Sequence, residues 1–256
     1  METRRNAPLT ARSVVASTLL GTRPPELAAR HLVRIGGLFG IAEGTVRVAL
    51  SRMVAAGELD TVDGRYRLTG RLLERQARQE SSRAPVLGAW DGTWEVRLVV
   101  GDARTAADRT ALRDAARALR LAERREGVWL RPANLEPGRA RGAAAVIAAQ
   151  TEGYTAMPTT DPAALAAALW DLAGWATEAE RLGVEMFPLA DRLAAGDTAA
   201  LAPGFVLSAA VLRHLLADPL LPDPLVPADW PGVELRAAYG RFDAAFRAQL
   251  SGWLRA

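Results

Sequence analysis

Residues 40–57 read GIAEGTVRVALSRMVAAG, and this stretch decides how the first part of the chain folds. Val46, Leu50 and Met53 recur at helical spacing, so they predict one apolar face of an α-helix. The glycine-rich start of the stretch predicts a tight connection into that helix, and Gly57 is suited to end it.

The residues on either side complete a recognisable order of elements. Upstream, Thr10 can cap one helix and the Pro24-Pro25 pair can begin a second, with Ala28, Leu32 and Ile35 as its apolar face. Downstream, Asp63-Gly64 separates two short alternating segments, which is a strong signal for a β-hairpin. Helix, helix, turn, helix, hairpin is the order of a winged helix-turn-helix; a small helical bundle with a solvated arginine surface is the alternative.

The outward positions of this region suit contact with DNA. Short hydroxyl groups can reach phosphates or bases, and a guanidinium group can donate two hydrogen bonds to the edge of a guanine. On the hairpin, two arginines alternate with Tyr66 and therefore share one face. The candidate DNA-binding residues are Thr45, Arg47, Ser51 and Arg52 on the predicted third helix, and Arg65 and Arg67 on the hairpin.

Charge and composition limit the classes of function. The chain has 256 residues and a net charge of +3, but residues 1–83 carry +6, residues 84–141 carry +3 and residues 142–256 carry −6. A basic N-terminal region followed by an acidic C-terminal region predicts a polyanionic partner for the N-terminal region. All 32 basic residues are arginine, which also fits a GC-rich genome.

The composition argues against several kinds of binding site and against a membrane or secreted location. With no cysteine and two histidines, we expect no disulfide, no thiolate or histidine metal site and no resident cofactor. No uninterrupted apolar run of about 18 residues predicts a membrane span. The polar, basic segment Met1–Arg12 does not resemble a signal peptide, so we expect a cytoplasmic protein.

The rest of the chain predicts two further domains, so the fold class is multidomain α+β. After residues 1–83, strand, helix and strand patterns between 84 and 160 fit a ferredoxin-like α+β domain. Residues 161–256 read as an all-helical C-terminal domain for dimerisation or effector binding. Within it, residues 218–227 are too rich in proline for a helix, and their leucines need burial.

Sequence motifs along almost the whole chain resemble those of the PaaX family of transcriptional repressors. The resemblance begins with residues 40–57 and continues through Trp90-Asp91-Gly92-Thr93-Trp94. The family pattern continues at the positions of Arg109 and Arg113, Gly127-Val128-Trp129-Leu130-Arg131-Pro132, Trp170-Asp171-Leu172, Asp218-Pro219-Leu220-Leu221-Pro222 and Trp230-Pro231-Gly232.

The resemblance implies a homodimeric repressor that binds double-stranded operator DNA. Family members typically control genes of aromatic catabolism, notably phenylacetate degradation, and their inducer is typically the aryl-CoA thioester phenylacetyl-CoA. Arg120-Leu121-Ala122 stands where the family pattern is rich in glycine. This departure leaves open the exact inducer and a role in another pathway, such as secondary metabolism.

A CoA thioester needs cations for its phosphates and an apolar slot for its acyl group. The candidate effector-binding residues are Arg109, Arg113, Arg131, Trp90, Trp94 and Trp129. The alternative for the arginines is a solvated helix neutralised by neighbouring acids, and for the tryptophans a place in the core.

Two other classes of function stay open. A ferredoxin-like domain can carry a magnesium-dependent nuclease, with Asp91 or Asp102 as a metal ligand. Against this, the sequence contains no phosphate-binding loop of the glycine-rich type that ends in lysine. Its two distant histidines also indicate no set of nucleophile, base and acid. The third class is a protein-interaction module whose acidic tail binds a partner.

Overall fold

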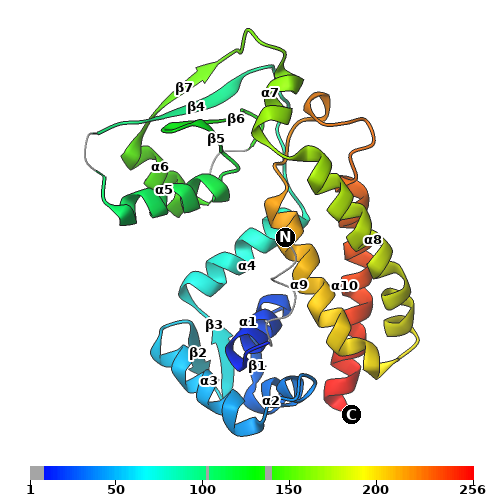
Figure 1. Cartoon of the computed structure of the whole chain (residues 1–256). Helices are drawn as coiled ribbons and strands as arrows, with labels where there is room; N and C mark the ends of the chain where they lie inside the picture. The colour runs from blue at the N-terminus through cyan, green and yellow to red at the C-terminus, as the bar shows by residue number, and fades with distance from the viewer. Residues whose placement is uncertain (1–8, 102–103, 136–139) are drawn as a thin grey trace. The chain divides into compact units, whose positions relative to one another are not determined.

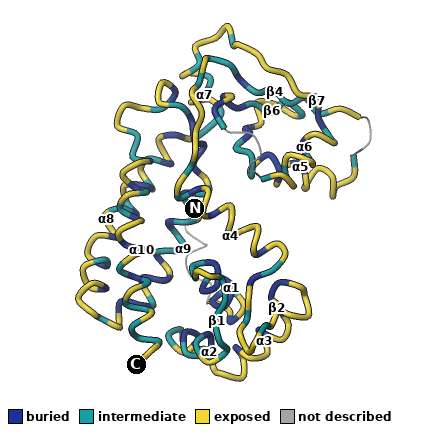
Figure 2. The backbone as a smooth tube through the Cα atoms, turned by 180° about the vertical axis from the view of Figure 1, so that it is seen from behind, coloured by how far each residue is buried: buried dark blue, intermediate teal, exposed yellow. Residues whose placement is uncertain are grey.

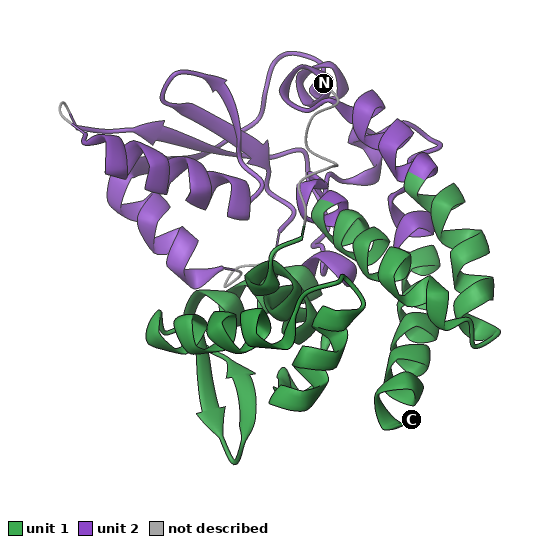
Figure 3. Ribbon diagram, turned by 60° about the horizontal axis from the view of Figure 1, so that its bottom comes forward, with its two compact units in different colours: residues 1–80, 182–213, 237–256 green, residues 81–181, 214–236 purple. Residues whose placement is uncertain are grey.

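The structure is a computed structural model that describes residues 9–101, 104–135 and 140–256. Over these residues it is a mixed α+β fold with ten α-helices and two small sheets. The chain divides into two compact units (Figure 3). Unit 1 comprises residues 1–80, 182–213 and 237–256, and unit 2 comprises residues 81–181 and 214–236.

The N-terminal part of unit 1 contains three helices and a three-stranded sheet (Figure 1). The side chain of Thr10 caps the first helix by accepting a hydrogen bond from the Ser13 backbone N–H, as the sequence predicts. The strands are all antiparallel, in the order β1-β3-β2. The elements are α1 (Ala11–Gly21), β1 (Glu26–Ala28), α2 (Ala29–Gly37), α3 (Glu43–Ala55), β2 (Leu59–Val62) and β3 (Arg65–Leu68).

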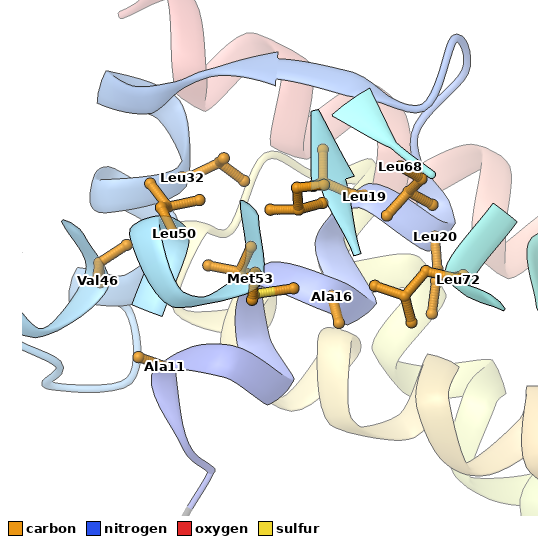
Figure 4. Close-up of a cluster of buried hydrophobic side chains, with 12 residues drawn as sticks. Ala11, Ala16, Leu19, Leu20, Leu32, Val46, Leu50, Met53, Leu68 and Leu72 are labelled. Atoms are coloured by element: carbon orange, nitrogen blue, oxygen red, sulfur yellow. The ribbon is translucent and has the colours of Figure 1, made fainter. Parts of the chain in front are cut away.

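One apolar cluster holds these elements together. Leu19 of α1, Leu32 of α2 and Leu50 of α3 are at most 1% exposed, and they meet as Figure 4 shows. Helices α2 and α3 approach closely at Gly36, where a Cβ atom would lie 2.6 Å from Cγ2 of Val46. Glycine at this position therefore sets how tightly the two helices pack.

The second helix begins later than the sequence predicts. The Pro24-Pro25 pair does not start it; β1 follows the prolines, and α2 begins at Ala29. A residue that precedes proline is biased towards extended backbone, so the pair favours a strand here rather than a helix start. Of the predicted apolar face, Leu32 and Ile35 are buried on α2, whereas Ala28 lies in β1.

The middle of the chain, in unit 2, forms a four-stranded antiparallel sheet in the order β5-β6-β4-β7. Two helices lie on one face of it (Figure 1). The sequence indicates the strands near 93–100, 128–130 and 154–157 and the helix near 105–121, but not β5 or α6. The elements are β4 (Trp94–Val99), α5 (Ala106–Ala118), β5 (Ala122–Arg125), β6 (Val128–Pro132), α6 (Arg141–Gln150) and β7 (Thr151–Ala156).

The remaining elements are helical. The predicted burial of the leucines in the proline-rich segment is confirmed, because Leu220, Leu221 and Leu225 are at most 6% exposed. Short 3-10 turns lie at Thr198–Ala200 and Asp223–Leu225. The helices are α4 (Gly70–Arg83), α7 (Pro162–Leu169), α8 (Leu172–Ala194), α9 (Leu201–Ala217) and α10 (Gly232–Arg255).

One stretch of the described residues, Thr198–Ala217, is long and apolar enough for a membrane span by length and composition alone. A helix in the interior of a protein passes the same test. Leu201, Val211 and Leu215 in this stretch are fully buried against other parts of the chain. The stretch is therefore only weak evidence for a membrane helix.

Candidate nucleic-acid interface

The outer face of α3 carries the first group of candidate DNA-binding residues. Val46, Leu50 and Met53 are each 1% exposed and fix the helix against the apolar cluster. The alternation of buried and exposed positions along α3 is visible in Figure 2. The predicted residues all lie on the exposed side: Thr45, Arg47, Ser51 and Arg52.

The two arginines of α3 differ in their surroundings. Arg47 pairs with Glu43 one turn earlier, with Nη2 2.7 Å from Oε1, and both side chains are more than half exposed. The Ser51 hydroxyl donates to the Arg47 carbonyl at 3.2 Å. The side chain of Arg52 makes no hydrogen bond or ion pair with any residue that the structure describes. It is therefore the cation on this face that is most available to a partner.

The hairpin of β2 and β3 presents the second group. Its turn residues Asp63 and Gly64 have φ angles of 50° and 72°, the pattern of a tight two-residue turn that matches the twist of the strands. Arg65 and Arg67 are exposed on one face of β3, with the half-buried Tyr66 between them. The alternation predicted from the sequence is confirmed.

Glu26 of β1 holds both hairpin arginines. Its Oε1 accepts from Nε of Arg65 at 3.1 Å, and its Oε2 accepts from Nε and Nη2 of Arg67 at 2.9 and 2.8 Å. The bond from Arg67, with the positive charges of both arginines, holds the pKa of Glu26 below its usual value. The carboxylate therefore stays ionised and neutralises one of the two positive charges.

Local sequence patterns do not single out Glu26. Its place in β1 depends on the extended backbone after the two prolines, and the pairing of Glu26 with Arg67 across the strands depends on the sheet register. The Pro-Pro pair was the available signal, because it predicts an extended segment that could lie beside the hairpin.

Arg131, one of the effector candidates, belongs to the core of unit 2. It is 1% exposed, and it donates to the carbonyls of Pro132 and Leu119 at 2.8 Å and to Oδ1 of Asn134 at 2.7 Å. Asn134 in turn donates to the Leu220 carbonyl at 3.0 Å. These bonds commit the guanidinium group to holding together β6, the end of α5 and the proline-rich segment.

The tryptophan candidates lie on opposite faces of the four-stranded sheet. Trp129 packs on the helix-covered face with Leu112 and Ile147. Trp94 and Trp90 pack in a second cluster with residues of α7. The indole N–H groups of Trp94 and Trp129 are buried without a partner among the described residues, whereas that of Trp90 donates to the Thr93 carbonyl at 2.7 Å.

Arg109 and Arg113 lie on the exposed side of α5. Arg109 donates to the Arg104 carbonyl at 2.9 Å. The structure therefore brings Trp90 and Trp94 together and leaves these two arginines at the surface. It does not gather the six effector candidates in one cluster.

The features proposed for a nuclease do not form a metal centre in the part of the chain that the structure describes. The Asp91 carboxylate accepts from the Thr93 backbone N–H at 3.0 Å and from its hydroxyl at 2.6 Å, which makes it a turn-forming residue. Asp102 lies outside the described residues. Within them, no three His, Cys, Asp or Glu side chains are grouped to hold a metal ion.

Comparisons with known proteins identify two matching regions. The model of PaaX-like proteins matches residues 10–72, and the model of the PaaX-like C-terminal domain matches residues 170–256. Among solved structures, the chain is similar to the uncharacterized protein Rv0674 from Mycobacterium tuberculosis. The identity is 44%, 95% of this chain and 98% of that chain are covered, and the TM-score is 0.70.

The chain belongs to the PaaX-like family. The prediction from residues 40–57 and the later motifs is thereby confirmed. A comparison with curated proteins finds no match. Family membership supports transcription regulation and DNA binding, and members of the family are regulators rather than enzymes.

The PaaX-like match at residues 10–72 contains all six candidate DNA-binding residues and also Glu26. The match at 170–256 contains the proline-rich segment and α8 to α10. The four-stranded sheet of unit 2 and all six effector candidates lie between the two matches.

Proposed function

We propose that this PaaX-like protein is a cytoplasmic, homodimeric transcriptional repressor. Residues 1–83 act as a winged helix-turn-helix domain, with α3 as the recognition helix and the β2–β3 hairpin as the wing. Residues 84–160 act as a ferredoxin-like domain, and the order β5-β6-β4-β7 with two helices on one face supports this assignment. Residues 161–256 supply the helical domain for dimerisation or effector binding.

The exposed face of α3 is the observation that carries the proposal. It offers hydroxyl groups and a guanidinium group without a partner among the described residues, in a region that matches a DNA-binding family. A helix of this kind fits the major groove, where Arg52 can donate to a guanine and Thr45 and Ser51 can reach phosphates or bases. Arg65 and Arg67 then contact the backbone beside the groove.

A dimer would place two such helices in successive major grooves of a partly palindromic operator. An inducer releases the operator only to the extent that it binds the DNA-incompetent state more tightly. We propose an aryl-CoA thioester of the phenylacetyl-CoA type, with regulation of another pathway as the alternative. Arg109 and Arg113 are exposed at the surface of unit 2, where they could bind the phosphates of the CoA group, whereas Arg131 is buried in the core.

Selection of duplexes from a random pool, followed by binding and cleavage assays, tests this proposal. We expect one partly palindromic sequence to be enriched and bound without cleavage in the presence of Mg²⁺. Phenylacetyl-CoA should then release it. If other acyl-CoA thioesters release the duplex instead, the proposed inducer is wrong but the proposed repressor function stands. Magnesium-dependent cleavage, or no preference for any duplex, would contradict the proposed function.

A further inference from the structure

We propose that Glu26 is an internal competitor of DNA phosphate, which occupies Arg65 and Arg67 and so limits how strongly the wing binds any duplex. The inference rests on the proposed function, because it assigns a regulatory role within the same interface. Its chemistry is that of one anion replacing another on a pair of guanidinium groups.

The geometry of the three side chains supports competition. Each carboxylate oxygen of Glu26 accepts from a different arginine, and Nη2 of Arg65 also lies 3.4 Å from the Glu26 carbonyl oxygen. In this arrangement two guanidinium groups donate to the two oxygens of one anion. A phosphodiester also has two free oxygens, so it can accept hydrogen bonds from the same two groups. A phosphate that takes the N–H groups now bonded to Glu26 must therefore displace the carboxylate from them.

Glu26 is held more firmly than an ordinary surface carboxylate. Its side chain is 18% exposed, whereas those of Arg65 and Arg67 are 44% and 47% exposed. The antiparallel pairing of β1 with β3 places Glu26 directly opposite Arg67. The carboxylate is thus fixed by the sheet, and its two partners remain open to solvent on their other sides.

The neighbouring carboxylate of the hairpin does not share this role. Asp60 faces Arg67 from the other side, in the register of β2 with β3. Its Oδ1 accepts from the Thr61 backbone N–H at 2.7 Å instead of from an arginine. Asp60 therefore adds negative charge to the same part of the sheet but holds no guanidinium group of the described residues, which makes it the matched control.

Glu26→Gln keeps the shape of the side chain and removes its charge. We expect this variant to bind both a selected and a random duplex about five- to tenfold more tightly at 0.1 M salt. The slope of log affinity against log salt should steepen by about one unit, the value for one additional neutralised phosphate. Asp60→Asn removes the same charge nearby and should change affinity less than about threefold, with an unchanged slope.

A second pair of variants shows whether the effect passes through the two arginines. In an Arg65→Gln/Arg67→Gln background, Glu26→Gln should no longer tighten binding. Thermal unfolding of every variant confirms that the compared proteins are folded.

The outcomes separate this inference from the proposed function. If the wild-type protein binds duplex DNA and Glu26→Gln binds no more tightly than Asp60→Asn, or more weakly, Glu26 is not a competitor. A gain that persists without the two arginines also overturns the inference. If neither the wild type nor Glu26→Gln binds any duplex, the proposed function fails and the inference fails with it.

Discussion

Arginines at two places in this molecule have opposite surroundings. On α3, Arg52 is exposed and meets no partner among the described residues, whereas on β6 Arg131 is 1% exposed and donates to three oxygen acceptors. A buried guanidinium group must be satisfied by its surroundings, because its desolvation would otherwise cost several kcal/mol, on the order of 3–5. An exposed one keeps its donors for water or for a ligand.

The comparison shows that residue type alone does not identify a binding site. Arg131 lies between leucine and proline in a motif shared with a regulator family, which made it a candidate for binding an anionic effector. Its neighbours in space accept the hydrogen bonds that a ligand would need. Exposure and available donors, rather than charge, distinguish the arginines that a ligand can reach.

The largest expected effect follows from removing the buried guanidinium group. Arg131→Met removes the guanidinium group that donates to the carbonyls of Leu119 and Pro132 and to the amide oxygen of Asn134. We expect the free energy of unfolding to fall by about 3–5 kcal/mol, measured by urea denaturation. Arg113→Met, at an exposed position, should stay within about 0.5 kcal/mol. Equal small decreases in the free energy of unfolding of both variants would show that the buried and the exposed arginine do not differ in their contribution to stability.

The close approach of α2 and α3 gives the next effect. Gly36→Ala places a Cβ atom 2.6 Å from Cγ2 of Val46, so α3 must shift or Val46 must repack. We expect a decrease of about 1–3 kcal/mol in the free energy of unfolding. Gly37→Ala has nothing within 4 Å of its new atom and should be neutral or slightly stabilising. The reverse order of the two variants would show that the helices do not pack closely at Gly36.

Arg52→Ala should change DNA binding without changing stability. If Arg52 contacts a base, affinity for the selected duplex falls by about 1–3 kcal/mol at fixed salt. Arg117→Ala, at an exposed arginine of unit 2, serves as the control. Affinity that is unchanged in Arg52→Ala removes this residue from the interface.

The smallest effect is expected for the wing. Arg65→Gln or Arg67→Gln should weaken binding to all sequences alike, because phosphate contacts carry no sequence information. The slope of log affinity against log salt should become shallower by about one unit for each phosphate that the variant no longer neutralises. A change in sequence preference with an unchanged slope would instead indicate that the wing arginines touch bases.

Much of the N-terminal part of unit 1 could be predicted from the sequence. The apolar spacing of Val46, Leu50 and Met53 and the Asp63-Gly64 turn are local signals, and the exposed positions on α3 and β3 follow from them. The partner of the wing arginines could not be predicted in this way. Glu26 and Arg67 are 41 positions apart, and only the register of β1 against β3 brings them together.

The effector candidates illustrate the same limit. The sequence places Trp94 and Trp129 in strands, but their opposite faces depend on the pairing of β4 with β6. The burial of Arg131 depends on Asn134 and on the Leu220 carbonyl of the distant proline-rich segment. Local patterns predict elements well, whereas contacts between distant elements decide which side chains remain available.

The central claim is that the outer face of α3 lies against DNA. Val48 is 51% exposed on that face, so a photo-crosslinking amino acid can replace it without disturbing the core. We predict that the variant with the crosslinker at position 48 attaches covalently to the selected duplex, and that the variant with it at position 117 of unit 2 does not. Crosslinking at 117 with none at 48 would contradict the account.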